Sequence, residues 1–214
     1  MINNIKAAIF DLDGTLVDSM WVWEKIDIDY LSSKNLTVPS TLKDEISHLS
    51  FTDVALYFKT TFNLSDSLED ILTTWNKMAF NHYSNNVKLK PGVLEYLQFL
   101  KKNDIKIGLA SSNNLTLIET VLKANKIYDY FDAITTTDEA QKNKSNPDIY
   151  LLTAKKLNIQ PTDCVVFEDI VAAVKGAKLA NMKVIAIYDD TSKDNKNLLS
   201  ELADQYIYDY KELI

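Results

Sequence analysis

Two aspartates separated by one residue follow an apolar run near the start of the chain. The run, residues 7–10, has the composition of a buried strand, and Asp11, Asp13 and Gly14 stand where that strand would break into a turn. Alternation along an extended chain places the two carboxylates on the same side. Like charges this close repel each other unless a cation lies between them, and divalent cations prefer carboxylate and carbonyl oxygens. These residues therefore predict a metal site at the carboxyl end of a strand, with an acidic surface turn as the alternative.

A polar segment that suits an anion follows a second apolar segment. The segment Ser111-Ser112-Asn113-Asn114 comes directly after residues 105–110, at the expected start of a helix. Hydroxyl and amide groups, together with the exposed backbone N–H groups of a helix N-terminus, can hold a phosphate. The same residues could also form an ordinary helix cap, so this segment alone leaves both interpretations open.

A lysine and a second acidic pair complete the set of candidate residues. Lys144 lies in a polar turn just before a helix that a proline begins, where an isolated lysine would usually be solvated. Glu168 and Asp169 directly follow the apolar run 164–167, where they could also serve as helix caps. In combination, the candidate residues offer acidic ligands for a metal, and lysine, hydroxyl and amide groups for a phosphate.

From residue 88 onward, helical and strand patterns alternate. Helices are expected near residues 91–100, 115–126, 147–157 and 171–180, and strands near 105–110, 133–135, 164–167, 184–187 and 206–208. Such alternation is typical of a parallel sheet with helices on both faces. We therefore predict an α/β fold with a doubly wound parallel sheet, formed by residues 1–16 and 88–214. The carboxyl ends of its strands are where such sheets place their ligands.

Residues 17–87 interrupt this alternation. Their apolar side chains recur at helical spacing, and the segment contains no convincing strand. Insertions are tolerated where a loop leaves a sheet, and this one leaves beside the first acidic pair. We therefore predict an inserted all-helical cap that acts as a lid on the site.

The composition is that of a soluble globular protein. Of the 214 residues, 46% are hydrophobic and 25% charged, the net charge is −7, and all 23 basic residues are lysines dispersed along the chain. A nucleic-acid surface needs a basic stripe, so nucleic acid is not expected as a partner. No apolar run suits a signal peptide or a membrane span, so we expect a cytoplasmic protein that does not bind membranes. The sequence predicts no particular oligomeric state.

The candidate residues resemble the four motifs of the haloacid dehalogenase (HAD) superfamily of phosphohydrolases. The motifs stand here as Asp11-Leu12-Asp13-Gly14-Thr15, Ser111, Lys144 with Pro147-Asp148, and Glu168-Asp169. The resemblance covers nearly the whole chain. The insertion is similar to the α-helical cap of the subfamily that contains phosphoglycolate phosphatases and β-phosphoglucomutases.

This resemblance implies a covalent mechanism. Asp11 would attack phosphorus to form an aspartyl phosphate, and Asp13 would protonate the leaving oxygen and then activate water. Ser111 would hydrogen-bond the phosphoryl group, with Ser112 and Asn113 beside it.

The resemblance also implies a magnesium ion. The ligands of Mg²⁺ would be the Asp11 carboxylate, the Asp13 backbone carbonyl and the Asp169 carboxylate, with Glu168 as a further ligand or a neighbouring acid. Lys144 would neutralise the phosphoryl group and pair with Asp11.

The first residues of the insertion depart from the resemblance. Many relatives carry Asp-Ser-Glu-Pro-Leu-His there, whereas this chain reads Asp18-Ser19-Met20-Trp21-Val22-Trp23. The chain also has no arginine, so the cap arginine that sugar-phosphate mutases use for a second phosphate is absent. We predict a Mg²⁺-dependent phosphatase that acts on a small phosphorylated metabolite. A β-phosphoglucomutase-type mutase, and a phosphate-responsive binding or signalling module without turnover, are the alternatives.

Overall fold

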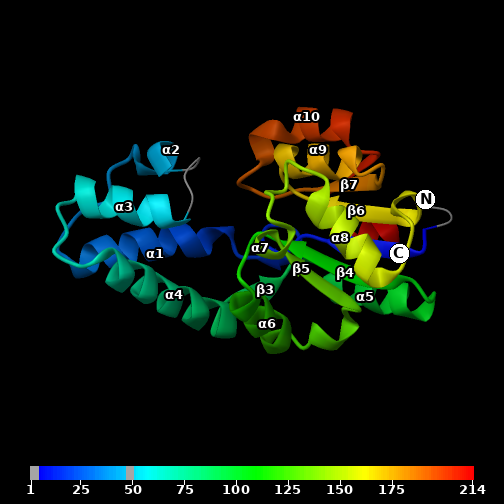
Figure 1. Ribbon diagram of the computed structural model, residues 1–214, viewed down its shortest axis with the longest axis horizontal. Helices are drawn as coiled ribbons and strands as arrows, with labels where there is room; N and C mark the ends of the chain where they lie inside the picture. The colour runs from blue at the N-terminus through cyan, green and yellow to red at the C-terminus, as the bar shows by residue number, and fades with distance from the viewer. Residues whose placement is uncertain (1–4, 47–50) are drawn as a thin grey trace. The chain divides into compact units, whose positions relative to one another are not determined.

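The first and last parts of the chain come together in one structural unit, and the residues between them form a second. The computed structural model describes residues 5–46 and 51–214. Unit 1 comprises Met1–Ser19 and Val87–Ile214, and unit 2 comprises Met20–Asn86 (Figure 1). All candidate residues named above belong to unit 1.

Unit 1 is built on a six-stranded sheet in the order β5-β4-β1-β6-β7-β8, whose neighbouring strands are parallel. The strands are β1 Ala7–Phe10, β4 Lys106–Ser111, β5 Ala133–Thr136, β6 Cys164–Glu168, β7 Lys183–Ile187 and β8 Gln205–Ile207. Strands β1 and β6 are buried along their whole length, which explains why they read as continuous apolar runs. The predicted doubly wound parallel sheet is confirmed.

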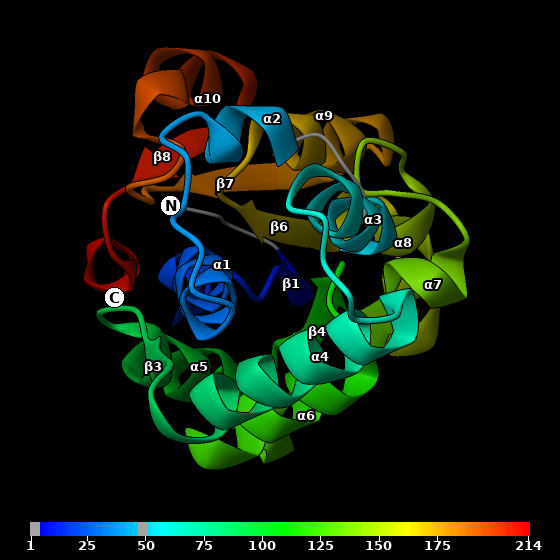
Figure 2. The ribbon, with the colours of Figure 1, turned by 90° about the vertical axis from the view of Figure 1, so that its left-hand side faces the viewer.

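Helices cover both faces of this sheet. They are α5 Val93–Lys102, α6 Leu115–Ala124, α7 Thr137–Ala140, α8 Asp148–Leu157, α9 Val171–Leu179 and α10 Lys196–Leu202, and 3-10 turns include η4 Tyr210–Leu213. Helices α8, α9 and α10 lie over one face, whereas α5 and α6 lie over the other (Figure 1, Figure 2). The chain thus moves outward from β1 to β5 and returns to the centre at β6, so the strand order reverses beside β1.

Aromatic packing holds the ends of the two central strands. Phe10 of β1 stacks on Phe167 of β6 with ring centroids 4.5 Å apart. Tyr96 of α5 and Tyr210 of η4 pack against both rings. Buried aromatic pairs of this kind add about 0.5–1.5 kcal/mol beyond their area burial. Phe10 and Phe167 immediately precede Asp11 and Glu168, so the packing of the two rings fixes the backbone that carries these acids.

One short strand, β2 Val17–Asp18, contradicts the prediction that residues 17–87 contain helices without a strand, and its partner β3 Lys88–Leu89, just after that range, was also not predicted. Strand β2 pairs antiparallel with β3. A strand of two residues cannot show an alternating pattern, so nothing in the sequence marks it. Helices α7 and α10 were also not predicted, because α7 has four residues and α10 buries Leu199 as its one fully buried side chain.

Unit 2 is helical, as predicted for the insertion. It contains α1 Met20–Ser33, α2 Leu42–Ile46, α3 Phe51–Thr61 and α4 Leu68–Asn85, and its described residues include no strand. Trp75 of α4 packs edge-on against Phe58 of α3 and Tyr30 of α1, with ring centroids 4.8 and 5.7 Å apart. Of all the helices that the structure describes, none is both long and apolar enough to cross a membrane.

Candidate active site

Candidate residues stand at the carboxyl ends of three adjacent strands. Asp11 follows β1, Ser111 ends β4, and Glu168 ends β6, with β1 between the other two strands. The Asp11 N–H group donates to the Phe167 carbonyl at 3.0 Å, which extends the β1–β6 pairing as far as the acid. The tertiary order of the strands therefore brings together residues that lie more than 150 positions apart in the sequence.

A tight turn begins between the two aspartates. The Leu12 carbonyl accepts the N–H groups of Leu16 at 2.9 Å and Val17 at 3.0 Å, so the extended conformation stops at Leu12. Gly14 has a φ of 79°, a left-handed conformation that a glycine adopts without strain. The two-residue alternation of a strand consequently does not continue through Asp13.

The carboxylate of Asp13 has its own partners. Ser19 Oγ donates to Asp13 Oδ1 at 2.6 Å, and Asn113 Nδ2 donates to Asp13 Oδ2 at 3.1 Å. Both donors are uncharged side chains, and they orient the half-buried carboxylate. Asn113 was predicted to line a phosphate site, and its side chain links that segment to the first acidic motif.

The residues at the end of β4 differ in burial and in hydrogen bonding. Ser111 is buried, and its Oγ accepts the Asn113 N–H group at 3.0 Å. Ser112 is exposed. The helix cap is Asn114, whose Oδ1 accepts the Leu117 N–H group at 3.0 Å. The capping interpretation of this segment thus applies to Asn114, and the Ser111 hydroxyl stays at the strand end.

Lys144 lies inside the protein, where it joins two acids. Its Nζ donates to Asp11 Oδ1 and, at 2.7 Å, to Glu168 Oε1. Burial lowers the pKa of Lys144, but the charges of Asp11 and Glu168 and their hydrogen bonds raise it further, so the net direction is upward. Gly176 of α9 makes room for this loop, because a Cβ there would lie 2.0 Å from the Lys144 carbonyl oxygen.

Asp11, Glu168 and Asp169 form a buried acidic group. One carboxylate oxygen of each lies within 4.8 Å of the others. Burial raises the pKa of Glu168, and repulsion from Asp11 raises it further against the opposing effect of Lys144. Burial likewise raises the pKa of Asp169, and the charge of Asp11 adds to the shift. The ammonium of Lys144 alone cannot neutralise three carboxylates, so the group favours an additional cation.

Unsatisfied oxygens indicate where a cation would bind. Within the described part of the chain, Glu168 Oε2 and Asp169 Oδ2 are buried and accept no hydrogen bond. The other Asp169 oxygen, Oδ1, accepts the Thr15 hydroxyl at 3.2 Å. Oxygen donors with unmet lone pairs are the ligands that hard divalent cations take. The residues present thus fit a metal.

Tyr150 is a residue of this site that the sequence analysis missed. It lies on α8, is fully buried, and its hydroxyl contacts Glu168 Oε1 at 2.9 Å and the Ala173 carbonyl at 3.2 Å. Burial raises the pKa of Tyr150, so the phenol remains a hydrogen-bond donor. In the sequence, Tyr150 resembles any aromatic residue on the apolar face of a helix, and no local pattern distinguishes its hydroxyl.

Comparison with known proteins places the chain in a family. The family model for haloacid dehalogenase-like hydrolases matches residues 8–187. Hexitol phosphatase B of Escherichia coli (strain K12) is 30% identical over 189 residues, 86% of this chain and 83% of that protein. The β-phosphoglucomutase of Bacillus subtilis (strain 168) is 29% identical over 202 residues, with the same two shares.

A solved structure supports the same assignment. A Thermotoga maritima protein, provisionally assigned as a β-phosphoglucomutase, has a TM-score of 0.84 and 28% identity over 95% of this chain and 94% of that chain. The family match includes Asp11, Ser111 and Glu168. The chain therefore belongs to the haloacid dehalogenase-like hydrolases, and it is a phosphohydrolase with a phosphatase or phosphoglucomutase-like activity.

Proposed function

We propose that this protein is a Mg²⁺-dependent phosphatase that hydrolyses a small phosphate monoester through an aspartyl phosphate on Asp11. The observation that carries the proposal is the buried group of Asp11, Glu168 and Asp169, the first two of which accept hydrogen bonds from Lys144. Asp13 stands two residues after Asp11. A surface acidic turn would not bury three carboxylates with two of their oxygens unsatisfied.

The metal site would include the two buried oxygens that lack a hydrogen bond, Glu168 Oε2 and Asp169 Oδ2. Asp11, Asp169 and Glu168 would supply carboxylate ligands, and Asp13 its backbone carbonyl. Bound Mg²⁺ would offset the buried negative charge and the charge that develops on the phosphoryl group. Tyr150 and Lys144 hold Glu168 Oε1, which leaves Oε2 available to the metal.

The chain's own residues would move the phosphoryl group in two steps. A carboxylate oxygen of Asp11 forms a bond to phosphorus while the ester bond breaks, and Asp13 gives its proton to the leaving oxygen. Asp13 then takes a proton from a water molecule, which attacks phosphorus and releases Asp11. Ser111, with Ser112 and Asn113, would donate hydrogen bonds to the phosphoryl oxygens, and Lys144 would neutralise them.

The relatives support a carbohydrate phosphate as the substrate class. One is a hexitol phosphatase and another a β-phosphoglucomutase, and each matches 86% of this chain. Hexitol phosphates and hexose phosphates are therefore the first compounds to assay. We also propose that residues 1–16 and 88–214 act as the catalytic core and residues 17–87 as the cap that selects among these compounds.

The first test is phosphate release from a panel of sugar and sugar-alcohol phosphates, with Mg²⁺ and after removal of metal by a chelator. We expect turnover with Mg²⁺, its loss with the chelator, and its recovery when Mg²⁺ is added back. Asp11→Asn should lower turnover by several powers of ten while far-ultraviolet circular dichroism shows a folded protein. Turnover of this variant near the wild-type rate would rule out the aspartyl phosphate.

A further inference from the structure

Lys90 is a partly buried lysine that the chemistry described so far does not use. It follows β3 directly, and its side chain is only 10% exposed. Its Nζ donates to the Gly14 carbonyl at 2.6 Å, to the Tyr188 carbonyl at 2.6 Å, and to Asp189 Oδ2 at 3.0 Å. An ammonium has three N–H donors, so each has an acceptor.

These contacts join Lys90 to the turn that carries Asp13. Gly14 immediately follows Asp13, and the Lys90 backbone N–H group also donates to the Leu16 carbonyl at 2.9 Å. Lys90 therefore holds the turn at two carbonyls, one through its side chain and one through its backbone. The carboxylate of Asp13 accepts hydrogen bonds from Ser19 and Asn113, and its position is also fixed by the backbone that carries it, which this turn forms.

Asp189 balances the charge of Lys90. It follows β7, is 8% exposed in its side chain, and its Oδ1 accepts the Thr191 N–H group at 2.9 Å and the Thr191 hydroxyl at 2.6 Å. Burial raises the pKa of Asp189, but the Thr191 hydrogen bonds and the charge of Lys90 lower it more, so the net direction is downward. A buried ammonium without such a partner would be costly.

The ion pair also lies beside a proposed ligand of the metal. Lys90 Nζ donates to the Gly14 carbonyl, and Gly14 is next in the chain to Asp13, whose backbone carbonyl is a proposed ligand. Removal of the Asp189 charge would leave Lys90 as an unbalanced cation on this side of the metal ligands. An unbalanced cation opposes the binding of another cation.

We propose that Lys90 and Asp189 are a positioning pair: Lys90 anchors the backbone of the Asp13 turn for proton transfer, and Asp189 keeps the anchor electrically neutral. The proposal rests on the function proposed above and deepens it. Lys90 acts through Asp13 and does not touch the phosphoryl group, so its loss should impair protonation of the leaving oxygen while phosphate binding is retained.

The leaving group provides the decisive measurement. An alkyl phosphate, such as a hexose 6-phosphate, needs a proton on its leaving oxygen, whereas p-nitrophenyl phosphate has a leaving group that departs without one. The ratio kcat/KM reports the steps up to formation of the aspartyl phosphate, so it isolates this proton transfer. Lys90→Met should lower kcat/KM for the alkyl ester about 10- to 100-fold. This loss lies at or below the lower end of the range for general acid catalysis, because Asp13 itself is still present. The value for p-nitrophenyl phosphate should change little.

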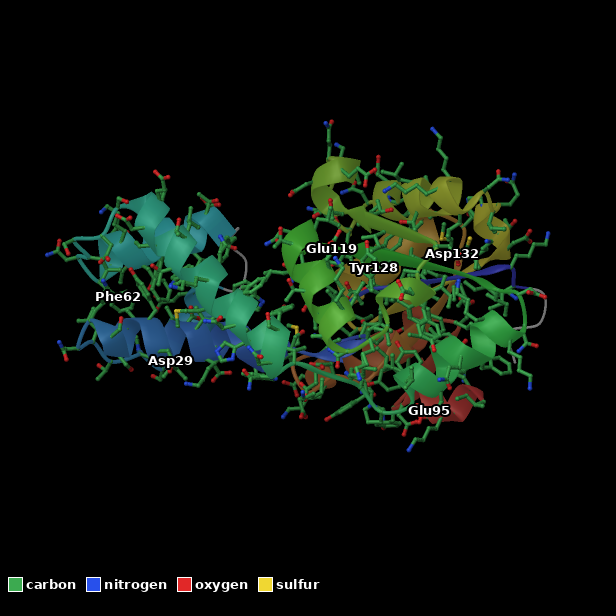
Figure 3. All side chains as sticks on the ribbon, turned by 90° about the horizontal axis from the view of Figure 1, so that it is seen from below. Asp29, Phe62, Glu95, Glu119, Tyr128 and Asp132 are labelled. Carbon is green, nitrogen blue, oxygen red and sulfur yellow. The ribbon has the colours of Figure 1, made fainter. Side chains whose placement is uncertain are left out.

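Lys101→Met is the matched control. Lys101 of α5 pairs with Asp132 at 2.8 Å, and Asp132 accepts the Ile107 N–H group at the start of β4, at the opposite end of that strand from Ser111. Asp132 is labelled in Figure 3. Lys101→Met removes an ion pair of unit 1 that lies at the start of β4, away from the contacts that Lys90 makes with the Asp13 turn. The variant should therefore keep the wild-type kcat/KM for both esters.

Two more variants separate the roles of the pair. Asp189→Asn keeps an acceptor for Lys90 but removes the charge, so a higher Mg²⁺ concentration should be needed for half-maximal activity. The double variant Lys90→Met, Asp189→Asn removes both charges. It replaces Lys90→Met in the assay if that single variant does not fold. It should show the same selective loss on the alkyl ester.

The outcomes separate failure of the positioning role from failure of the proposed phosphatase function. An equal loss on both esters, or no loss on either, in a folded Lys90 variant of an active enzyme would overturn the positioning role alone. An unchanged Mg²⁺ requirement in Asp189→Asn would overturn the role of Asp189. No turnover of any phosphate ester by the wild-type protein would overturn both proposals.

Discussion

At the scale of residues, the acidic group depends on hydrogen bonds from one charged side chain, Lys144, and from two uncharged hydroxyls. Glu168 is buried, and one of its oxygens is shared by the Lys144 ammonium and the Tyr150 hydroxyl. Thr15 holds one oxygen of Asp169 in the same way. These hydrogen bonds orient the carboxylates so that the remaining oxygens converge, which is how neighbouring groups tune a metal site.

Tyr150→Phe tests this orientation. The variant keeps the ring in the core but removes a donor from a buried carboxylate, which costs about 1–3 kcal/mol of unfolding free energy. We also expect a roughly 10-fold higher Mg²⁺ concentration for half-maximal phosphate release, since loss of such a hydrogen bond typically costs this much metal affinity. Denaturant unfolding and a Mg²⁺ titration measure the two effects. Tyr208→Phe, at an exposed tyrosine, should change neither.

At the scale of elements, the site requires a close approach between α9 and the loop of Lys144. The backbone of α9 passes so near the loop that a Cβ at Gly176 would lie 2.0 Å from the Lys144 carbonyl oxygen and 2.9 Å from that of Asn146. Both neighbours are backbone atoms, which cannot move aside by changing a rotamer. The glycine therefore sets the depth at which Lys144 enters the site.

Gly176→Ala should displace this loop. Overpacking of this kind typically costs about 1–3 kcal/mol of stability, and a displaced Lys144 would lose its contacts with Asp11 and Glu168. We expect kcat to fall by more than the unfolded fraction of the protein can explain. Gly108→Ala is the control, because its Cβ would meet the Thr153 side chain at 2.6 Å inside the core. It should lower the unfolding temperature, and the folded fraction should keep its kcat. Equal kcat losses in both variants would contradict this role of Gly176.

At the scale of the whole molecule, the chain offers few groups for holding a second phosphate. A sugar-phosphate mutase must retain a bisphosphate and return its phosphoryl group before water takes it. This sequence contains no arginine, and Met20 and Trp23 stand where many relatives carry glutamate and histidine. Lysine can supply a point charge but not the two-pronged hydrogen bonding of arginine.

We therefore expect hydrolysis to dominate over isomerisation. The enzyme is given β-glucose 1-phosphate, Mg²⁺ and a trace of the bisphosphate. The formation of glucose 6-phosphate and the release of inorganic phosphate are then measured in the same reaction. Inorganic phosphate should be the main product. Rapid formation of glucose 6-phosphate with negligible phosphate release would instead identify a mutase, and cap lysines would then hold the second phosphate.

Local patterns in the sequence determined the strands β1, β4 and β6, the polar residues that follow them, and the helical character of residues 17–87. These features are visible because apolar runs, breaks and helical spacing are properties of neighbouring residues. They were sufficient for the fold class and for naming Asp11, Ser111, Lys144, Glu168 and Asp169 as one candidate site.

Only the tertiary structure decided which groups meet within that site. The hydroxyl of Tyr150 on Glu168, the amide of Asn113 on Asp13 and the ammonium of Lys90 on Gly14 join residues 18, 100 and 76 positions apart. A core tyrosine and a turn lysine look ordinary in a sequence, because their roles depend on distant partners that the strand order and the helix packing bring within hydrogen-bond distance. The reversal of strand order beside β1 is the physical reason that these separate segments share one site.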